Sequence, residues 1–191
     1  RLNVGAMSLD DPYLPWVPPL VQGGIGDNVM AIRFWEESWQ KFIEWRIRAL
    51  VKQGFNGVLL DGLDGWQAWA SDNQLLREKQ MRDLVAKIHN YITRILAQNF
   101  CLIVHGEEHW HFDVNYIDAI HGVMVKNVFY KDGIARDLTE VVAQVNNLNL
   151  FLSLGKSVLV LEYLNNTEEQ NAFIEQAQLL NIKPCILPLS N

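Results

Sequence analysis

The sequence predicts an α/β fold built from parallel βα units. Short apolar runs of strand length alternate with longer segments of helical periodicity along most of the 191 residues. The apolar runs are continuous rather than alternating, which indicates strands that are buried on both faces by covering helices. No internal repeat or interdomain linker interrupts the pattern, and the length suits one domain with a sizeable core. We therefore expect a single domain over residues 1–191.

The composition is that of a globular protein, with 49% hydrophobic and 20% charged residues. The formal net charge of −6 argues against a nucleic-acid partner, because such surfaces need clustered Lys and Arg. No apolar run approaches the roughly 18 residues that span a bilayer. Cys101 and Cys185 lie in apolar runs, so we expect both to be buried as small hydrophobes. The chain starts at Arg1 with no Met and no signal-peptide pattern, and we expect that Arg1 is not the native start.

The first elements are a strand and a long loop. Leu2 to Leu9 reads as the strand, and Asp10 and Asp11 follow it. Pro12 to Asp27 is a Pro- and Gly-rich loop, too long for an ordinary connection. Its aromatic side chains, Trp16 among them, could contact a ligand or cover the end of the sheet, and the sequence favours neither use.

The next elements are a strand and an amphipathic helix. Val29 to Phe34 is the strand, with Arg33 near its end, and a helix spans about Glu36 to Gln53 and ends at Gly54. Apolar residues at helical spacing predict that one face of this helix packs in the core. They are Trp39, Phe42, Ile43, Ile47, Leu50 and Val51.

A pair of carboxylates follows the central strand. The apolar run Val58 to Leu60 stops at Asp61, and Asp64 comes three residues later. Ligand sites in α/β folds lie where parallel strands end, so Asp61 is placed for chemistry. The alternative is that both acids cap the following turn through hydrogen bonds to the backbone.

The rest of the chain continues the alternation of helix and strand. A helix spans roughly Asn73 to Gln98, with a buried face formed by Met81, Leu84, Val85, Ile88, Ile92, Ile95 and Leu96. Strands follow at Phe100 to Val104, Ala119 to Val125, Ser157 to Leu161 and Ile182 to Leu187. They end at His105, at Lys126, at Glu162 with Tyr163, and near the C-terminus. Helices are predicted to begin at Asp137, with Glu140 at the spacing of a capping box, and at Thr167, with Gln170.

Four segments resemble one known family in the same order. They read RFWEESWQ from Arg33, QGFNGVLLDGLDGWQ from Gln53, GVMVKNVFY from Gly122 and GKSVLVLEY from Gly155. Together they resemble glycoside hydrolase family 114, the endo-α-1,4-polygalactosaminidase-like barrels, from about Ala31 to the C-terminus. The resemblance implies a (β/α)8 TIM barrel that lacks or does not show its first strand or strands, because the chain is shorter than the usual length of about 250 residues.

The resemblance also implies a chemistry. Glycosidases need two carboxyl groups, a proton donor and a nucleophile or base. Asp61 matches one catalytic acid of the family, whereas the position of the second acid falls on Lys126. Glu162 and Asp64 are the candidate substitutes for that acid, and Lys126 could instead form a salt bridge within the site.

The residues after His105 suggest a second kind of site. Glu107, Glu108, His109 and His111 invite a metal interpretation, but they follow a strand end rather than lying on a helix, where zinc motifs place them. We expect no metal and no cofactor. His105 is expected to hydrogen-bond within the cleft, and the other four residues are expected on a solvated loop.

These observations lead to one functional prediction and one alternative. We predict a hydrolase acting on an amino-sugar, galactosamine-containing exopolysaccharide, secreted or periplasmic as the resemblance implies, with no membrane span and an unspecified oligomeric state. The alternative is a catalytically inert barrel that binds polysaccharide or a partner protein; a metal-dependent hydrolase comes third. The expected catalytic residues are Asp61, Glu162 and Asp64, and the expected substrate-binding residues are Arg33, Trp66, His105, Lys126, Tyr130, Tyr163 and Trp16.

Overall fold

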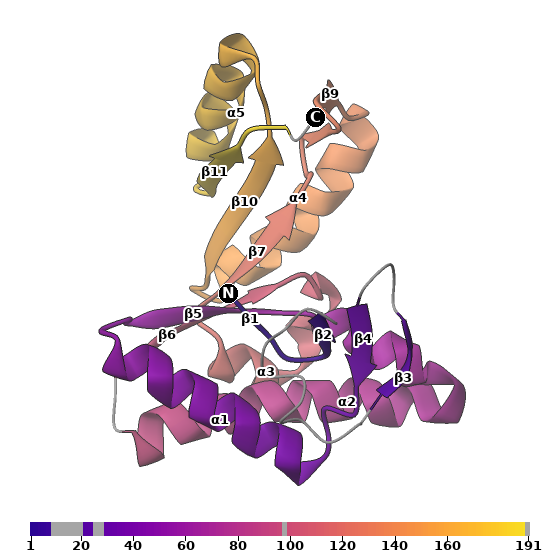
Figure 1. Cartoon of the computed structure of the whole chain (residues 1–191). Coiled ribbons are helices and arrows are strands. Elements are labelled where there is room, and N and C mark those ends of the chain that lie inside the picture. The colour runs from indigo at the N-terminus through magenta and orange to yellow at the C-terminus, as the bar shows by residue number, and fades with distance from the viewer. Residues whose placement is uncertain (9–20, 25–28, 97–98, 190–191) are drawn as a thin grey trace. The chain divides into compact units, whose positions relative to one another are not determined.

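The computed structural model describes residues 1–8, 21–24, 29–96 and 99–189 of the chain (Figure 1). They form two compact units. The first comprises residues 1–107 and 113–120, and the second comprises residues 108–112 and 121–191. Each unit is described by itself.

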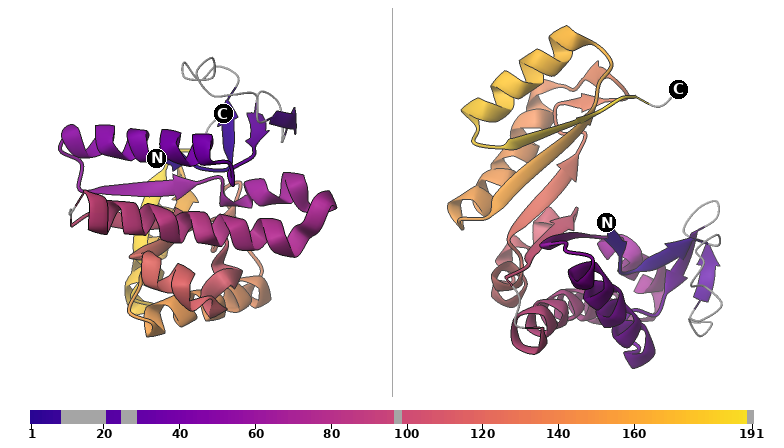
Figure 2. Two further views of the ribbon diagram at one scale, coloured as in Figure 1. Left: turned by 90° about the horizontal axis from the view of Figure 1, so that it is seen from below. Right: turned by 60° about the vertical axis from the view of Figure 1, so that its left-hand side comes forward.

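The first unit contains three parallel strands in the order β1 (Leu2–Asn3), β5 (Gly57–Asp61) and β6 (Cys101–His105). Leu2 pairs with Leu60, and Leu60 pairs with Val104. Helices α1 (Glu37–Lys52) and α2 (Ala70–Asn90) run side by side along one face of β5 and β6 (Figures 1 and 2). The predicted helix–strand alternation is therefore confirmed here.

A small antiparallel sheet differs from the prediction. β4 (Val29–Ile32) pairs antiparallel with β2 (Ala6–Ser8) and with β3 (Val21–Gly24), whereas we expected a parallel strand. The predicted strand from Leu2 to Leu9 is broken because Asn3 Oδ1 accepts hydrogen bonds from the N–H groups of Gly5 (3.2 Å) and Ala6 (2.8 Å), which turns the chain. Gly5 permits this turn, since a Cβ there would lie 2.1 Å from the carbonyl oxygen of Gly62.

The long helix also ends differently from its prediction. After α2 the chain forms a π-helical turn, η3 (Tyr91–Ile95), in which the N–H of Leu96 donates to the carbonyl of Tyr91 at 3.1 Å. A π turn inserts one residue and rotates the helix face. As a result Ile92 is buried as expected, but Ile95 is exposed. The predicted buried face of the helix is therefore correct as far as Ile92 and wrong at Ile95, after the π turn begins.

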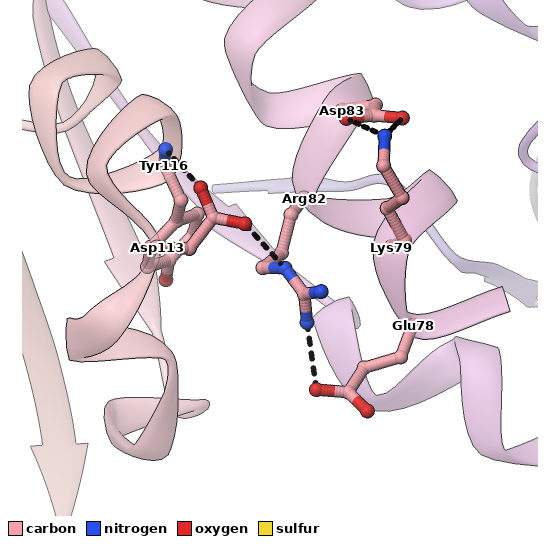
Figure 3. Close-up of polar contacts among 6 residues, drawn as sticks. All are labelled: Glu78, Lys79, Arg82, Asp83, Asp113 and Tyr116. Carbon is pink, nitrogen blue, oxygen red and sulfur yellow. Dashed lines mark hydrogen bonds and ion pairs between the residues drawn. The ribbon is translucent and has the colours of Figure 1, made fainter. Parts of the chain in front are cut away.

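An ion-pair network joins α2 to the short helix α3 (Val114–Ala119) within the first unit (Figure 3). Arg82 contacts Asp113 Oδ2 at 2.8 Å through Nε and Glu78 Oε1 at 2.7 Å through Nη1. The other oxygen of Asp113 accepts from the N–H of Tyr116 at 3.1 Å and caps α3. One carboxylate thus starts α3 and anchors it to α2.

The second unit also contains three parallel strands, in the order β7 (Gly122–Lys126), β10 (Ser157–Tyr163) and β11 (Lys183–Leu187). α4 (Leu138–Ser153) packs on β10, and α5 (Thr167–Leu179) packs on β11. The remaining elements are η2 (Leu63–Trp69) in the first unit, and η4 (Glu108–Phe112) and the hairpin strands β8 (Tyr130–Lys131) and β9 (Ile134–Ala135) in the second.

Two smaller expectations about side chains are corrected by the structure. Cys101 is exposed because it is the first residue of β6, ahead of the buried positions, and Cys185 is half-buried; both thiols are free. Glu140 does not complete a capping box with Asp137, because its carboxylate pairs with Arg136 at 2.8 Å. The cap of α4 is instead Asp137 alone, whose Oδ1 accepts from the N–H of Thr139.

Replacing Trp39 by Phe is expected to destabilise the chain by about 1–3 kcal/mol, because the buried carbonyl of Val4 would lose its donor. Trp39 is buried in α1, and its indole N–H donates to that carbonyl at 2.7 Å. Urea unfolding measures the effect. Trp45→Phe is the matched control, since Trp45 is 49% exposed, and we expect a change within about 0.5 kcal/mol. If Trp39→Phe and Trp45→Phe lost the same free energy of unfolding, the hydrogen bond from Trp39 to Val4 would not be the cause of the loss.

Candidate active site

Asp61 is the last residue of β5 and is paired on both sides. Its Oδ1 lies 2.7 Å from Nδ1 of His105 and accepts from the N–H of Gly62 at 2.9 Å, and its Oδ2 pairs with the guanidinium of Arg1. The register of β5 and β6 explains the first contact, because Leu60 opposite Val104 places the next residues, Asp61 and His105, side by side. The predicted hydrogen bonding of His105 is confirmed.

Asp64 has a different environment from Asp61. It lies in η2 and is exposed, whereas Asp61 is buried. The turn between them depends on Gly62, which has φ +71°, and on Gly65, where a Cβ would lie 2.6 Å from the carbonyl oxygen of Gly5. The two glycines thus allow this turn to pack closely against the chain beyond β1.

The aromatic side chains of η2 are covered in this structure. Trp66 is 6% exposed and Trp69 is 2% exposed. Trp69 meets the ring of Trp35 edge-on at 5.1 Å, and the guanidinium of the exposed Arg33 lies 5.5 Å from the centre of the Trp69 ring. The burial of Trp66 does not favour the predicted contact between its side chain and a substrate. The guanidinium of Arg33 already has an aromatic partner, the ring of Trp69.

The residues after β6 include a carboxyl group that the sequence did not single out for catalysis. Glu107 is 8% exposed and has φ +59°, directly after Gly106 with φ +75°. A left-handed Glu is uncommon, and such conformations gather at functional sites. Trp110 is also buried, so the expectation of a fully solvated loop is wrong for this part, although His109 is exposed. Gly106 was the only signal of this turn in the sequence.

Glu162 lies in the second unit, in β10, and its side chain is completely buried (0% exposed). Its Oε1 accepts from the N–H of Phe129 at 2.8 Å. Its Oε2 is buried and has no hydrogen-bond partner among the residues that the structure describes. Burial raises the pKa of Glu162 to about 6, against the opposing effects of the N–H groups of Phe129, Val128 and Tyr130 and of the Arg136 charge.

The other predicted residues of the second unit lie near the same strand ends. Lys126 is the last residue of β7 and is half-buried, and it pairs in register with Leu161, next to Glu162. Tyr130 is buried, and desolvation, together with the charges of Glu169 and Glu162, raises its pKa. Tyr163 ends β10 and is half-buried.

Some expectations concern residues outside this description. Trp16, Asp10 and Asp11 lie among the residues that are not described. Within the described ranges, no group of three or more His, Cys, Asp or Glu side chains could hold a metal ion. Across the same ranges, no helix has the length and apolar character needed to cross a bilayer.

The chain resembles solved structures over nearly its whole length. The glycoside hydrolase domain of PelA from Pseudomonas aeruginosa matches 98% of this chain and 76% of that one, with a TM-score of 0.79 and 15% identity. Ega3 of Aspergillus fumigatus, solved in complex with galactosamine, matches 98% of this chain and 73% of that one, with a TM-score of 0.73 and 15% identity. These likenesses show the fold, a TIM barrel of the glycoside hydrolase type.

Two curated proteins and one family model also match the chain. An uncharacterized protein of Methanocaldococcus jannaschii is 26% identical over 158 residues, which are 80% of this chain and 45% of that protein. One of Thermotoga maritima is 23% identical over 139 residues, 71% of this chain and 43% of that protein. The chain thus spans less than half the length of these two relatives. The model of glycoside-hydrolase family GH114 matches residues 27–186, and the chain belongs to that family.

Proposed function

We propose that the chain hydrolyses a galactosamine-containing polysaccharide, with Asp61 as the reacting carboxylate and Glu162 as the proton donor. Membership of family GH114 supports the reaction class, and the likeness to a structure that contains galactosamine supports the sugar. The observation that carries the proposal is that two strand-end carboxyl groups have opposite environments. Asp61 forms an ion pair with the guanidinium of Arg1 and a hydrogen bond with the imidazole of His105, whereas burial raises the pKa of Glu162 to about 6.

This contrast fits the division of labour in glycosidases. Glu162 would give its proton to the glycosidic oxygen as the bond from that oxygen to the anomeric carbon breaks. Asp61 would either attack the anomeric carbon, forming a glycosyl ester that water then hydrolyses, or take a proton from the water that attacks this carbon. Hydrogen bonds to His105 and Gly62 hold Asp61 Oδ1, which fixes the orientation of the carboxylate.

Lys126 supports the expectation that cleavage is slow. We expect the second acid of the family at this position, and an ammonium group cannot do the work of a carboxylic acid as proton donor there. Glu162 is completely buried in β10, whereas position 126 at the end of β7 is half-buried. The proton of Glu162 is therefore less accessible to a substrate than the proton of an acid at position 126 would be. We place the action of the protein outside the cytoplasm, where exopolysaccharides occur.

The rate of cleavage is expected to fall as the pH rises through about 6, because Glu162 loses the proton that it must donate. Glu162→Gln should lower the rate and remove this pH dependence. A reducing-end assay on a partially deacetylated galactosamine polymer between pH 4.5 and 8 measures both. An unchanged profile in Glu162→Gln would exclude Glu162 as the donor.

The same titration gives a control that does not depend on activity. A carboxyl group whose pKa is raised by folding contributes stability that is present at low pH and is lost as the pH rises. Between pH 4.5 and about 6 the free energy of unfolding should therefore fall, by about 2 kcal/mol in all. Urea unfolding should show this decline in the native chain and not in Glu162→Gln. If the free energy of unfolding declines in this way but the chain cleaves no polymer, the described environment of Glu162 is correct and only its catalytic role is refuted.

A second candidate function is a barrel that binds polysaccharide without cleaving it. The observation that favours it is Lys126 at the end of β7, where we expect the second acid of the family. Isothermal titration with the same polymer separates the two functions. Binding without any release of reducing ends, in a chain that is folded, would establish the binding function.

A further inference from the structure

The chain between β7 and α4 forms a hairpin that is closed at its base by Arg136. Asp132 and Gly133, with φ +52° and +75°, make the tight turn between β8 and β9. At the open end of the hairpin, Nη1 of Arg136 donates to the carbonyl of Asn127 at 2.8 Å. The backbone N–H of Arg136 donates to the carbonyl of Phe129, also at 2.8 Å. One residue therefore holds two carbonyls of the segment that follows Lys126.

The same segment is held on its other side by β10. Asn127 has φ +56°, and its N–H donates to the carbonyl of Leu161 at 3.0 Å. Phe129 donates its N–H to Glu162 Oε1 at 2.8 Å. A left-handed Asn costs little only where its surroundings fix it. The carbonyl contacts of Arg136 and the N–H contacts of β10 together define the backbone path from Lys126 to Phe129.

The guanidinium of Arg136 also pairs with an exposed surface carboxylate. Its Nε and Nη2 both contact Glu140 Oε2, at 3.0 Å and 2.8 Å. Glu140 is exposed, and the hydrogen bonds of Asn127 and Phe129 described above do not involve its side chain, which makes it a suitable control. The charged or titratable groups that interact with Glu162 are Arg136 and Tyr130, and Glu169 acts on Tyr130 in turn.

We propose that Arg136 is a positioning residue: by fixing the backbone from Asn127 to Phe129, it sets the hydrogen bond that holds Glu162 and the direction in which the chain leaves Lys126. The proposal rests on the proposed function at one point only, the role of Glu162 as the proton donor. The contacts themselves do not require catalysis.

The test uses the amide resonance of Phe129 in the full chain. Its chemical shift followed against pH reports the titration of Glu162, and its hydrogen exchange reports the strength of the Phe129 to Glu162 hydrogen bond. In Arg136→Met we expect the titration midpoint to move to higher pH and the exchange to accelerate by about tenfold, the factor that corresponds to one hydrogen bond of ordinary net strength. Glu140→Gln should leave the midpoint in place and change the exchange by less than about twofold.

Arg136→Lys separates position from charge and serves if the Met variant does not fold. It keeps the positive charge but loses the planar fork that reaches Asn127, so the exchange should accelerate while the midpoint stays near its native value. Native exchange in both Arg136 variants would overturn the proposal. Because neither readout uses a polysaccharide, a chain with the expected exchange rates that cleaves nothing would refute the proposed function and leave this inference standing.

Discussion

Lys126→Glu is expected to raise the rate of polysaccharide cleavage by about 10²- to 10⁴-fold, the contribution typical of a positioned general acid. Lys126 is the half-buried last residue of β7, and it stands where we expect the second catalytic acid of the family. A Glu at this position would supply the second carboxyl group that glycosidases need beside a nucleophile or base such as Asp61. The release of reducing ends from a galactosamine polymer measures the gain.

A neutral substitution provides the matched control for this variant. Lys126→Gln removes the ammonium charge without supplying an acid, so it should stay within about tenfold of the native rate. In the Lys126→Glu chain, a further Glu162→Gln substitution should have little effect, since the proton now comes from position 126. Equal rates for the native chain and Lys126→Glu would show that this position does not take part in the reaction.

Asp61→Asn is expected to lower cleavage by at least about 10³-fold, the scale on which removal of one member of a catalytic set acts. An amide retains the oxygen that accepts from Gly62 at 2.9 Å but cannot attack carbon or take a proton. The melting temperature should fall by no more than about 4 °C, because the amide still accepts from Gly62 and the Arg1 side chain that loses its charged partner is 64% exposed.

Asp64→Asn distinguishes the two acids of the segment. Asp64 is exposed in η2, and we expect its amide variant to retain most of the native rate and the native melting temperature. A loss as large as that of Asp61→Asn would instead identify Asp64 as the proton donor. Retained cleavage in Asp61→Asn would remove Asp61 from the mechanism.

Much of the fold could be predicted because the apolar patterns reflect burial directly. The stripe of α1 led to Trp39, Ile43 and Ile47, all of which are buried, and the apolar run before Asp61 forms a parallel strand as expected. The antiparallel pairing of β4 could not be predicted, since it follows from a turn at Asn3 and from the space at Gly5. Both the turn at Asn3 and the close packing at Gly5 involve atoms that come together only when the chain folds.

The candidate site was predictable to a similar degree. Asp61 and His105 each end an apolar run, and parallel register made their meeting foreseeable. The hydrogen bond from the Phe129 N–H to the buried Glu162 was not foreseeable, because it joins residues that are 33 positions apart. The contact of Arg136 with Asn127 was missed because Arg136 does not directly follow an apolar run. Glu107 was noticed only as a metal ligand, and its burial and left-handed backbone conformation could not be foreseen.

The most direct test of the account is to measure polymer binding and reducing-end release together, at pH 5.5, for the native chain and for Asp61→Asn. The account predicts that both bind the galactosamine polymer with similar affinity, that the native chain releases reducing ends slowly but measurably, and that Asp61→Asn releases none. Binding by both chains with no release from either, or equal release from both, would contradict the claim that Asp61 is the reacting carboxylate of a hydrolase.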